Sequence, residues 1–171
     1  MCGNLSTDNQ RKASFPPVVG PDCRLLVLGS LPGNASLAAG RYYAHPRNLF
    51  WHLIGHALGA DLHALDYAQR LSVLLQNRVG LWDTIGSATR PGSLDSAIRD
   101  VQSNELAALV AQLPDLRAIA FNGARSAQIG RKLLGGSGLE LVSLPSSSPA
   151  YAAMPLSEKE QLWLALRKFL R

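Results

Sequence analysis

The sequence predicts a three-layer α/β/α fold, in which helices cover both faces of a central four-stranded parallel sheet. Four short, continuous apolar runs are typical of strands that are buried on both faces. Segments with helical periodicity lie between these runs, and this alternation favours parallel strands joined by helices. The 171 residues suit one core, so we expect a polar N-terminal tail over residues 1–20 and a single domain over residues 21–171.

The predicted strands cover residues 24–28, 79–82, 118–121 and 139–144. In parallel sheets of this kind, ligands bind beyond the carboxyl ends of the strands. The residues that directly follow each apolar run are therefore the first candidates for a functional site.

Helical spacing of apolar residues appears in five segments, which cover residues 50–58, 66–75, 106–113, 124–134 and 157–170. Two of these segments open with the pattern of a capping box, in which two side chains at the helix start bind each other's backbone N–H groups. The pairs are Asp66 with Gln69 and Ser157 with Glu160. We therefore expect helices that begin after Asp66 and after Ser157.

The charge balance weakly favours a polyanionic partner, because 17 Lys and Arg residues exceed 12 Asp and Glu residues. Two cysteines are too few for an iron–sulfur cluster. His52 and His56 have a spacing used by zinc sites, but no third ligand is evident. We expect no metal and no cofactor. The chain has no signal-peptide pattern and no long apolar run, which predicts a cytoplasmic, nucleoid-associated protein that does not bind membranes.

The turn from Gly29 to Ser36 follows the first predicted strand. Its two glycines and its proline make a tight turn whose backbone N–H groups can hold an anion. The alternative is an ordinary connection between a strand and a helix.

The segment from Tyr42 to Trp51 is rich in aromatic, amide and basic side chains. Aromatic rings such as that of Tyr43 can stack on a base that has been extruded from DNA. Asn48 lies near the start of a predicted helix, where positive potential favours an anion. The alternative is that Phe50 and Trp51 belong to the core and that Asn48 only caps the helix.

Polar residues also follow the other predicted strands. Asp83 follows the second predicted strand, where it can either bind a ligand or cap the next turn. Asn122 and Gly123 follow the third predicted strand. The fourth leads into Leu144–Tyr151, where three serines lie between two prolines. Such a stiff loop can approach a phosphate closely, although a solvated serine-rich loop would have the same composition.

Taken together, these segments resemble the uracil-DNA glycosylase superfamily over roughly residues 24–151. The stretch His45–Trp51 is similar to the His-Pro-x-Asn-x-Phe-Trp stretch of the mismatch-specific uracil/thymine glycosylases. Most members place Asp or Asn before the proline of the first motif, where it positions or activates water, but this chain has Leu31 there. The pattern is closest to the hypoxanthine-DNA glycosylase branch, and the resemblance implies that Asn48 takes over the catalytic role.

The resemblance implies a monofunctional DNA glycosylase, a monomer that flips a deaminated base, foremost hypoxanthine, out of DNA and hydrolyses its N-glycosidic bond. Leu31 would offer backbone N–H groups to the base, and we infer that Asp83 accepts the N1–H of hypoxanthine. The expected catalytic residues are Asn48 and Ser30. The expected base-binding residues are Tyr43, Leu31 and Asp83. The expected DNA-binding residues are Ser36, Arg47, Ser146, Ser147, Ser148, Pro149, Ala150 and Tyr151.

Three alternatives remain open at this point. The same fold can act on uracil or thymine mismatches, which a panel of lesion-bearing duplexes would reveal. A DNA-binding protein without catalysis would bind DNA in a salt-sensitive way and release no base. A hydrolase of free nucleotides would use the Gly29–Ser36 turn as a phosphate cradle and bind duplex DNA weakly.

Overall fold

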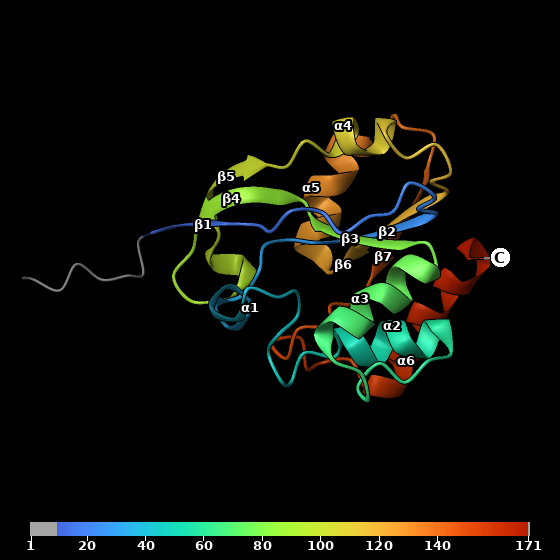
Figure 1. Cartoon of the computed structure of the whole chain (residues 1–171). Coiled ribbons are helices and arrows are strands. Elements are labelled where there is room, and N and C mark those ends of the chain that lie inside the picture. Colours follow the sequence, from blue (N-terminus) through green and yellow to red (C-terminus); the bar gives the residue numbers. More distant parts are fainter. Residues whose placement is uncertain (1–9, 171) are drawn as a thin grey trace, which may run out of the picture.

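The computed structural model describes residues 10–170, which form two sheets and six α-helices (Figure 1). The strands are β1 (Arg11–Ala13), β2 (Leu25–Gly29), β3 (Val79–Asp83), β4 (Ile85–Thr89), β5 (Arg99–Ser103), β6 (Ala118–Asn122) and β7 (Glu140–Leu144). The α-helices are α1 (Asn34–Ala39), α2 (Phe50–Leu58), α3 (Tyr67–Gln76), α4 (Leu106–Ala111), α5 (Ala124–Leu134) and α6 (Leu156–Leu164). Short 3-10 helices cover Asp95–Ala97 and Ala165–Phe169.

The larger sheet has four parallel strands in the order β3-β2-β6-β7, which confirms the predicted central sheet. The strand register places Gly29 beside Asp83, and Asn122 beside Leu144. Each of these residues is the last of its strand. The four carboxyl ends therefore finish at one level, along one edge of the sheet.

Each face of this sheet is covered by its own helices, which confirms the three-layer prediction (Figure 1). Leu25 and Val27 pack in a cluster with side chains of α2, α3 and α6. Leu26 and Leu28 pack in a second cluster with side chains of α4 and α5. Because successive side chains of a strand point to opposite faces, a strand that is buried on both faces must be apolar throughout.

A second, antiparallel sheet in the order β1-β4-β5 lies beside the first and was not predicted. Its strands β4 (Ile-Gly-Ser-Ala-Thr) and β5 (Arg-Asp-Val-Gln-Ser) contain small and polar residues in place of an apolar run. Such strands carry little of the signal by which buried strands are detected in a sequence. The β4–β5 connection contributes Asp95 to the site described below.

The packed part of the chain begins earlier than the predicted boundary at residue 21. Strand β1 pairs with β4, and the backbone of Val18 forms a bridge with Leu81. Phe15 packs against the larger core cluster and makes an edge-to-face contact with Tyr42, at 5.2 Å between ring centroids. Residues 11–20 thus form part of the folded structure, although their polar and proline-rich composition indicated a tail.

One of the two predicted capping boxes is present. The side chain of Asp66 accepts from the backbone N–H of Gln69 at 2.8 Å, and the side-chain oxygen of Gln69 accepts from the backbone N–H of Asp66 at 3.0 Å. The prediction at Ser157 was wrong, because α6 begins at Leu156, two residues before the predicted start, and follows Pro155 without a side-chain cap. Glu160 contacts His52 of α2 instead, at 2.9 Å.

Candidate active site

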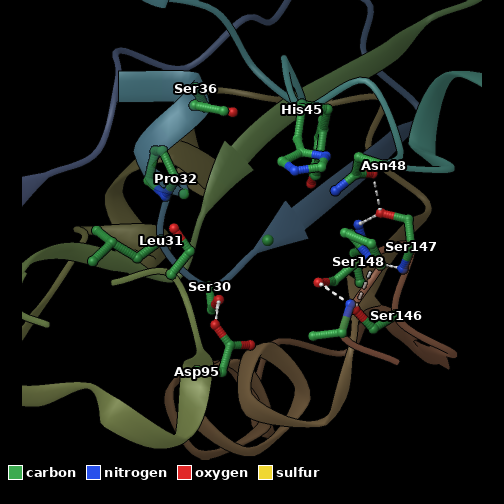
Figure 2. A pocket seen from close by; sticks show the side chains of 18 of the residues that line it. Ser30, Leu31, Pro32, Ser36, His45, Asn48, Asp95, Ser146, Ser147 and Ser148 are labelled. Atoms are coloured by element: carbon green, nitrogen blue, oxygen red, sulfur yellow. Dashed lines mark hydrogen bonds between the residues drawn. The ribbon is translucent and has the colours of Figure 1, made fainter. Parts of the chain in front are cut away.

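A cavity of about 300 Å³ opens at the carboxyl edge of the parallel sheet (Figure 2). It brings together side chains that follow β2, β3, β6 and β7, as well as the segment that leads into α2. Tyr43, Asn48, Asp83 and Ser147 all line it, as the sequence predicted. The other predicted site residues that line it are Ser30, Leu31, Ser36, Ser146, Ser148, Pro149, Ala150 and Tyr151. Arg47 is exposed and does not line the cavity.

Asp83 forms the buried inner part of this cavity and is 3% exposed. A Cβ atom at Gly29 would lie 2.7 Å from Asp83 Oδ1 and 3.0 Å from Tyr43 Oη, so glycine leaves room for both side chains. Asp83 Oδ2 and Tyr43 Oη are buried and have no hydrogen-bond partner within residues 10–170. Buried polar atoms in proteins are rarely left unpaired, so both atoms are suited to a ligand.

The buried position of Asp83 also changes its acidity. Burial raises the pKa of Asp83 to about 7, the negative charge of Asp95 adds to this rise, and the positive charge of Arg90 opposes it. Near neutral pH the carboxyl can therefore either accept or donate a hydrogen bond.

The ring of Tyr43 is held in a fixed orientation beside Asp83. It stacks on Phe50 with 3.9 Å between ring centroids and 14° between ring planes. Burial raises the pKa of the Tyr43 hydroxyl, and the Asp83 charge raises it further. Because Phe50 covers one face of the ring, an extruded base can stack only on the opposite face.

Asn48 is oriented by a chain of directional hydrogen bonds (Figure 2). Its Oδ1 accepts from the backbone N–H of Phe50 at 2.9 Å and from the hydroxyl of Ser147 at 2.8 Å. The Ser147 hydroxyl accepts in turn from Asn122 Nδ2 at 2.9 Å. Oδ1 is fully engaged, and Nδ2 has no acceptor among residues 10–170, so Asn48 presents its Nδ2 hydrogens as donors to the cavity.

The same bonds correct the expectation for Ser147. Ser147 is 1% exposed, and its hydroxyl both donates to Asn48 and accepts from Asn122. It is therefore not available to a phosphate. Ser147 serves to connect the residues that line the cavity.

Ser30 and Leu31 differ in what they offer to the cavity. The Ser30 hydroxyl donates to Asp95 Oδ1 at 2.7 Å. The Leu31 side chain is 7% exposed and packs in an apolar cluster with Ile85 and Ile98. Only the backbone of Leu31 is polar, so any hydrogen bond to a base must come from there.

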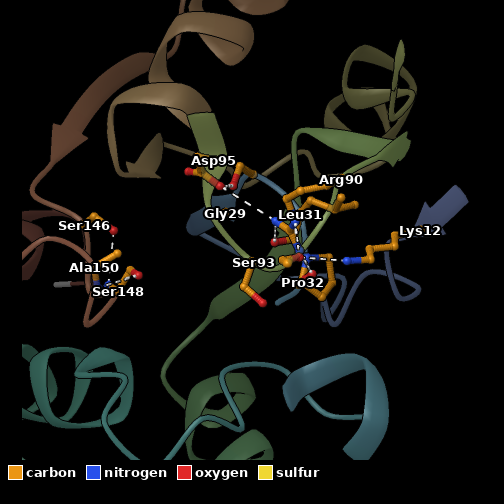
Figure 3. Close-up of polar contacts among 12 residues, drawn as sticks. Lys12, Gly29, Leu31, Pro32, Arg90, Ser93, Asp95, Ser146, Ser148 and Ala150 are labelled. Atoms are coloured by element: carbon orange, nitrogen blue, oxygen red, sulfur yellow. Dashed lines mark hydrogen bonds and ion pairs between the residues drawn. The ribbon is translucent and has the colours of Figure 1, made fainter. Parts of the chain in front are cut away.

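Arg90 contacts the turn from Gly29 to Ser36, which follows β2 (Figure 3). The residue is fully buried, and its guanidinium donates to the carbonyl oxygens of Leu31, Pro32 and Gly92. The planar guanidinium presents five N–H donors in a fixed geometry, which suits the binding of several carbonyls at once. Arg90 thereby fixes the backbone of the turn that follows β2.

The serine-rich loop is braced by short-range bonds. Ser146 Oγ accepts from the backbone N–H of Ser148 at 3.1 Å, and Ser148 Oγ accepts from that of Ala150 at 3.2 Å. Tyr151 is 41% exposed, and its carbonyl accepts from Lys159 Nζ of α6 at 2.6 Å. The loop thus presents an exposed aromatic side chain on a rigid backbone.

Ser36 is placed differently from the expectation. It is 6% exposed, and its hydroxyl accepts from the backbone N–H of Ala44 at 3.1 Å. Its oxygen therefore ties helix α1 to the segment that carries Tyr43.

Sequence reasoning assigned no role to three of the residues that build the cavity or hold its walls. Asn122 was noted as the end of a strand, and the strand-end rule would have sufficed to select it. Arg90 and Asp95 lie in a segment rich in glycine and proline, without periodicity. Only the antiparallel sheet brings that segment to the turn after β2.

Within residues 10–170, no group of three or more His, Cys, Asp or Glu side chains is arranged to hold a metal ion. None of the residues that line the cavity is a lysine. In the same part of the chain, no helix is both long and apolar enough to span a bilayer.

A family model described as the Uracil DNA glycosylase superfamily matches residues 16–170 of this chain. The chain belongs to this superfamily. Its fold and the position of its cavity beyond the carboxyl ends of β2, β3, β6 and β7 agree with that membership.

Two curated relatives of this chain come from species of Methanosarcina. A hypoxanthine DNA glycosylase of Methanosarcina acetivorans is 42% identical over 139 residues, which span 81% of this chain and 87% of the relative. A hypoxanthine DNA glycosylase of Methanosarcina barkeri is 39% identical over 140 residues, which span 82% and 88%.

A solved structure supports the same placement. A solution NMR structure of a candidate uracil DNA glycosylase from Methanosarcina acetivorans superposes with a TM-score of 0.85 at 37% identity. The match covers 95% of this chain and all of the solved chain.

Proposed function

We propose that this protein is a monofunctional DNA glycosylase that excises hypoxanthine from DNA by hydrolysis of the N-glycosidic bond. The observation that carries the proposal is the convergence of Tyr43, Asn48 and Asp83 on one cavity of about 300 Å³. The two curated relatives named as hypoxanthine DNA glycosylases support the choice of base.

The unpaired polar atoms at the inner end of the cavity suit a flipped base. The N1–H of hypoxanthine donates to Asp83 Oδ2, which has no partner within residues 10–170. The backbone N–H groups of the turn at Leu31 donate to the oxygen at position 6. The free face of Tyr43 stacks on the purine ring.

Asn48 acts on the reacting centre as a donor. Its Oδ1 is occupied by Phe50 and Ser147, so its Nδ2 hydrogens hold the attacking water or a sugar oxygen. Ser30 contributes to catalysis indirectly, because its hydroxyl donates a hydrogen bond to Asp95.

The rim of the cavity binds the DNA backbone. Ser146, Ser148 and the exposed Arg47 contact phosphates, while Ala150 and Tyr151 fill the gap that the flipped nucleotide leaves in the duplex. The protein acts as a monomer in the cytoplasm and needs no cofactor.

A panel of duplexes tests this proposal. Each duplex carries a single hypoxanthine, uracil or mismatched thymine, and the released base is identified by mass spectrometry. We expect hypoxanthine to be released fastest, with strand breaks appearing only after heat or alkali. Faster release of uracil would show that uracil, and not hypoxanthine, is the preferred base. Strand cleavage without heat or alkali would exclude a monofunctional reaction. DNA binding without release of any base would exclude catalysis.

A further inference from the structure

The hydrolysis proposed above needs a group that accepts the proton of the attacking water. Asn48 cannot be this group, since its Oδ1 already accepts two hydrogen bonds. The Leu31 side chain is apolar and packs in a core cluster. The acceptor must therefore come from another side chain at the cavity.

His45 lines the cavity but is engaged in the wrong way for this task. Its Nδ1 accepts from the backbone N–H of Arg47 at 3.1 Å. The neutral ring then carries its proton on Nε2, and that nitrogen is a donor. His45 can thus donate to a ligand, but it has no free acceptor in this tautomer.

Two carboxylates remain among the residues that line the cavity, and their surroundings differ. Asp83 is 3% exposed, and its burial favours the neutral form. The Asp95 side chain is 42% exposed and faces Arg90, with 3.9 Å between Oδ1 and Nη1. Two carboxyl groups in one site with different surroundings can serve as an acid and a base with separate tasks.

Asp95 is also held in a definite position (Figure 3). Ser30 donates to its Oδ1 at 2.7 Å, so Oδ1 is engaged by the turn that follows β2. Its Oδ2 has no hydrogen-bond partner among the residues that the structure describes. Figure 3 shows Asp95 on the side of the turn at Leu31, across from Ser146 and Ser148 of the serine-rich loop.

We propose that Asp95, held by Ser30 and Arg90, is the catalytic base of the glycosylase reaction. This role rests on the proposed function. The water oxygen forms a bond to C1′ of the sugar while the bond between C1′ and N9 breaks, and the electron pair of that bond leaves with the base. The water proton passes to Asp95 and then to solvent. The departing base takes a proton from water.

The charges around Asp95 are compatible with this role. Arg90 neutralises part of its charge, and the negative charge of Asp95 raises the pKa of the neighbouring Asp83. Arg99 and Arg125 line a neighbouring groove together with Asp95. A carboxylate in this setting also stabilises the positive charge that develops on the sugar in the transition state.

Single-turnover rates of base release from a hypoxanthine duplex test the proposal. Asp95→Asn keeps the shape of the side chain and removes the acceptor, so we expect a rate loss on the order of a hundredfold or more. The affinity for a duplex whose lesion carries a 2′-fluoro group, which resists cleavage, is expected to stay unchanged. Ser30→Ala is expected to reduce the rate less, because it removes only the hydrogen bond that positions Asp95.

Chemical rescue separates a base from a structural residue. Formate supplies a small carboxylate, so it is expected to restore part of the rate of Asp95→Ala but none of the rate of Asn48→Ala. Asp115→Asn is the matched control, because Asp115 is exposed and precedes β6 at the opposite end of the sheet. It removes the same charge and is expected to leave the rate unchanged.

The outcomes distinguish the two proposals. Base release by the wild type together with an undiminished Asp95→Asn rate would overturn the role of Asp95 alone. Equal losses in Asp95→Ala and Ser30→Ala without rescue by formate would reduce Asp95 to a structural residue and overturn it as well. A wild type that releases no base from any duplex would remove the proposed function, and the role of Asp95 with it.

Discussion

The amide of Asn48 and the hydroxyl of Ser147 are joined by a hydrogen bond of 2.8 Å, although 99 residues separate them in the chain. This bond connects the segment that leads into α2 with the loop that follows β7. Together with the backbone N–H of Phe50 it consumes both lone pairs of Asn48 Oδ1. The orientation of the amide, and hence its function as a donor, is set by this contact.

Replacing Asn48 with alanine should slow base release on the order of a hundredfold, as the loss of a donor to the transition state does in other enzymes. Asn48→Asp should be equally slow, because a carboxylate can still accept from Phe50 and Ser147 but cannot donate. Single-turnover assays measure both rates, with Asn77→Ala at the exposed C-cap of α3 as a control. A fully active Asn48→Asp variant would show that the donor is not needed.

Ser147→Ala should affect stability as well as activity. It leaves Nδ2 of the buried Asn122 without its acceptor, which costs about 1–3 kcal/mol of unfolding free energy. It also frees the amide of Asn48, so base release should slow. Urea unfolding measures the first effect, and Ser148→Ala is the control, since Ser148 bonds only within its own loop. A Ser147→Ala variant as stable as the wild type would contradict the buried network.

Arg90→Met should destabilise the protein on the order of 3 kcal/mol or more, because the carbonyls of Leu31 and Pro32 lose a buried charged donor. Arg90→Lys should recover little of this, since a single ammonium cannot reach several carbonyls at once. Thermal unfolding compares the two variants with the exposed Arg47→Met. Full stability of Arg90→Lys would mean that the fork geometry is not required.

Asp83 should make stability depend on pH. Its pKa is raised to about 7 from 3.8, so the native state holds the proton more tightly than the unfolded chain does. The resulting stabilisation is fully present at pH values below 3.8 and is lost as the pH rises to about 7. Asp83→Asn should remove this dependence and be more stable than the wild type at about pH 8.

Urea unfolding of both proteins between about pH 5 and pH 9 tests this sign. If Asp83 accepts the N1–H of hypoxanthine, wild-type base release should also rise through a pH of about 7, since a carboxylate is the stronger acceptor. Parallel stability curves for the two proteins would show that burial does not raise the pKa of Asp83.

Lys159→Met should impair the use of duplex DNA. Lys159 Nζ donates to the carbonyl of Tyr151 and lies 5.0 Å from the centre of its ring, so it positions the exposed tyrosine. Filling the gap in a duplex matters little for a single strand, which has fewer stacked neighbours to replace. We expect a greater rate loss on duplex than on single-stranded DNA, with the exposed Lys132→Met as control. Equal losses on both substrates would argue against a role for Tyr151 in the duplex.

The sequence by itself determined the parallel sheet and the edge at which the site lies. Strands buried on both faces must be apolar throughout, so the runs that became β2, β3, β6 and β7 are visible without a structure. Because parallel strands end along the same edge, Asp83 and the serine-rich loop could be placed together before any contact was known. Tyr43 and Asn48 stood out by their residue types and positions, and the resemblance implied the catalytic role of Asn48.

Only the tertiary structure decided which atoms of these residues are free. Ser147 has the same local appearance as Ser146, yet it is buried and its hydroxyl is engaged on both sides by Asn122 and Asn48. Asp95 reaches Ser30 only because β4 and β5 pair in an antiparallel sheet, and these strands contain no periodic apolar signal. Hydrogen-bond partners are set by three-dimensional packing, which local composition does not encode.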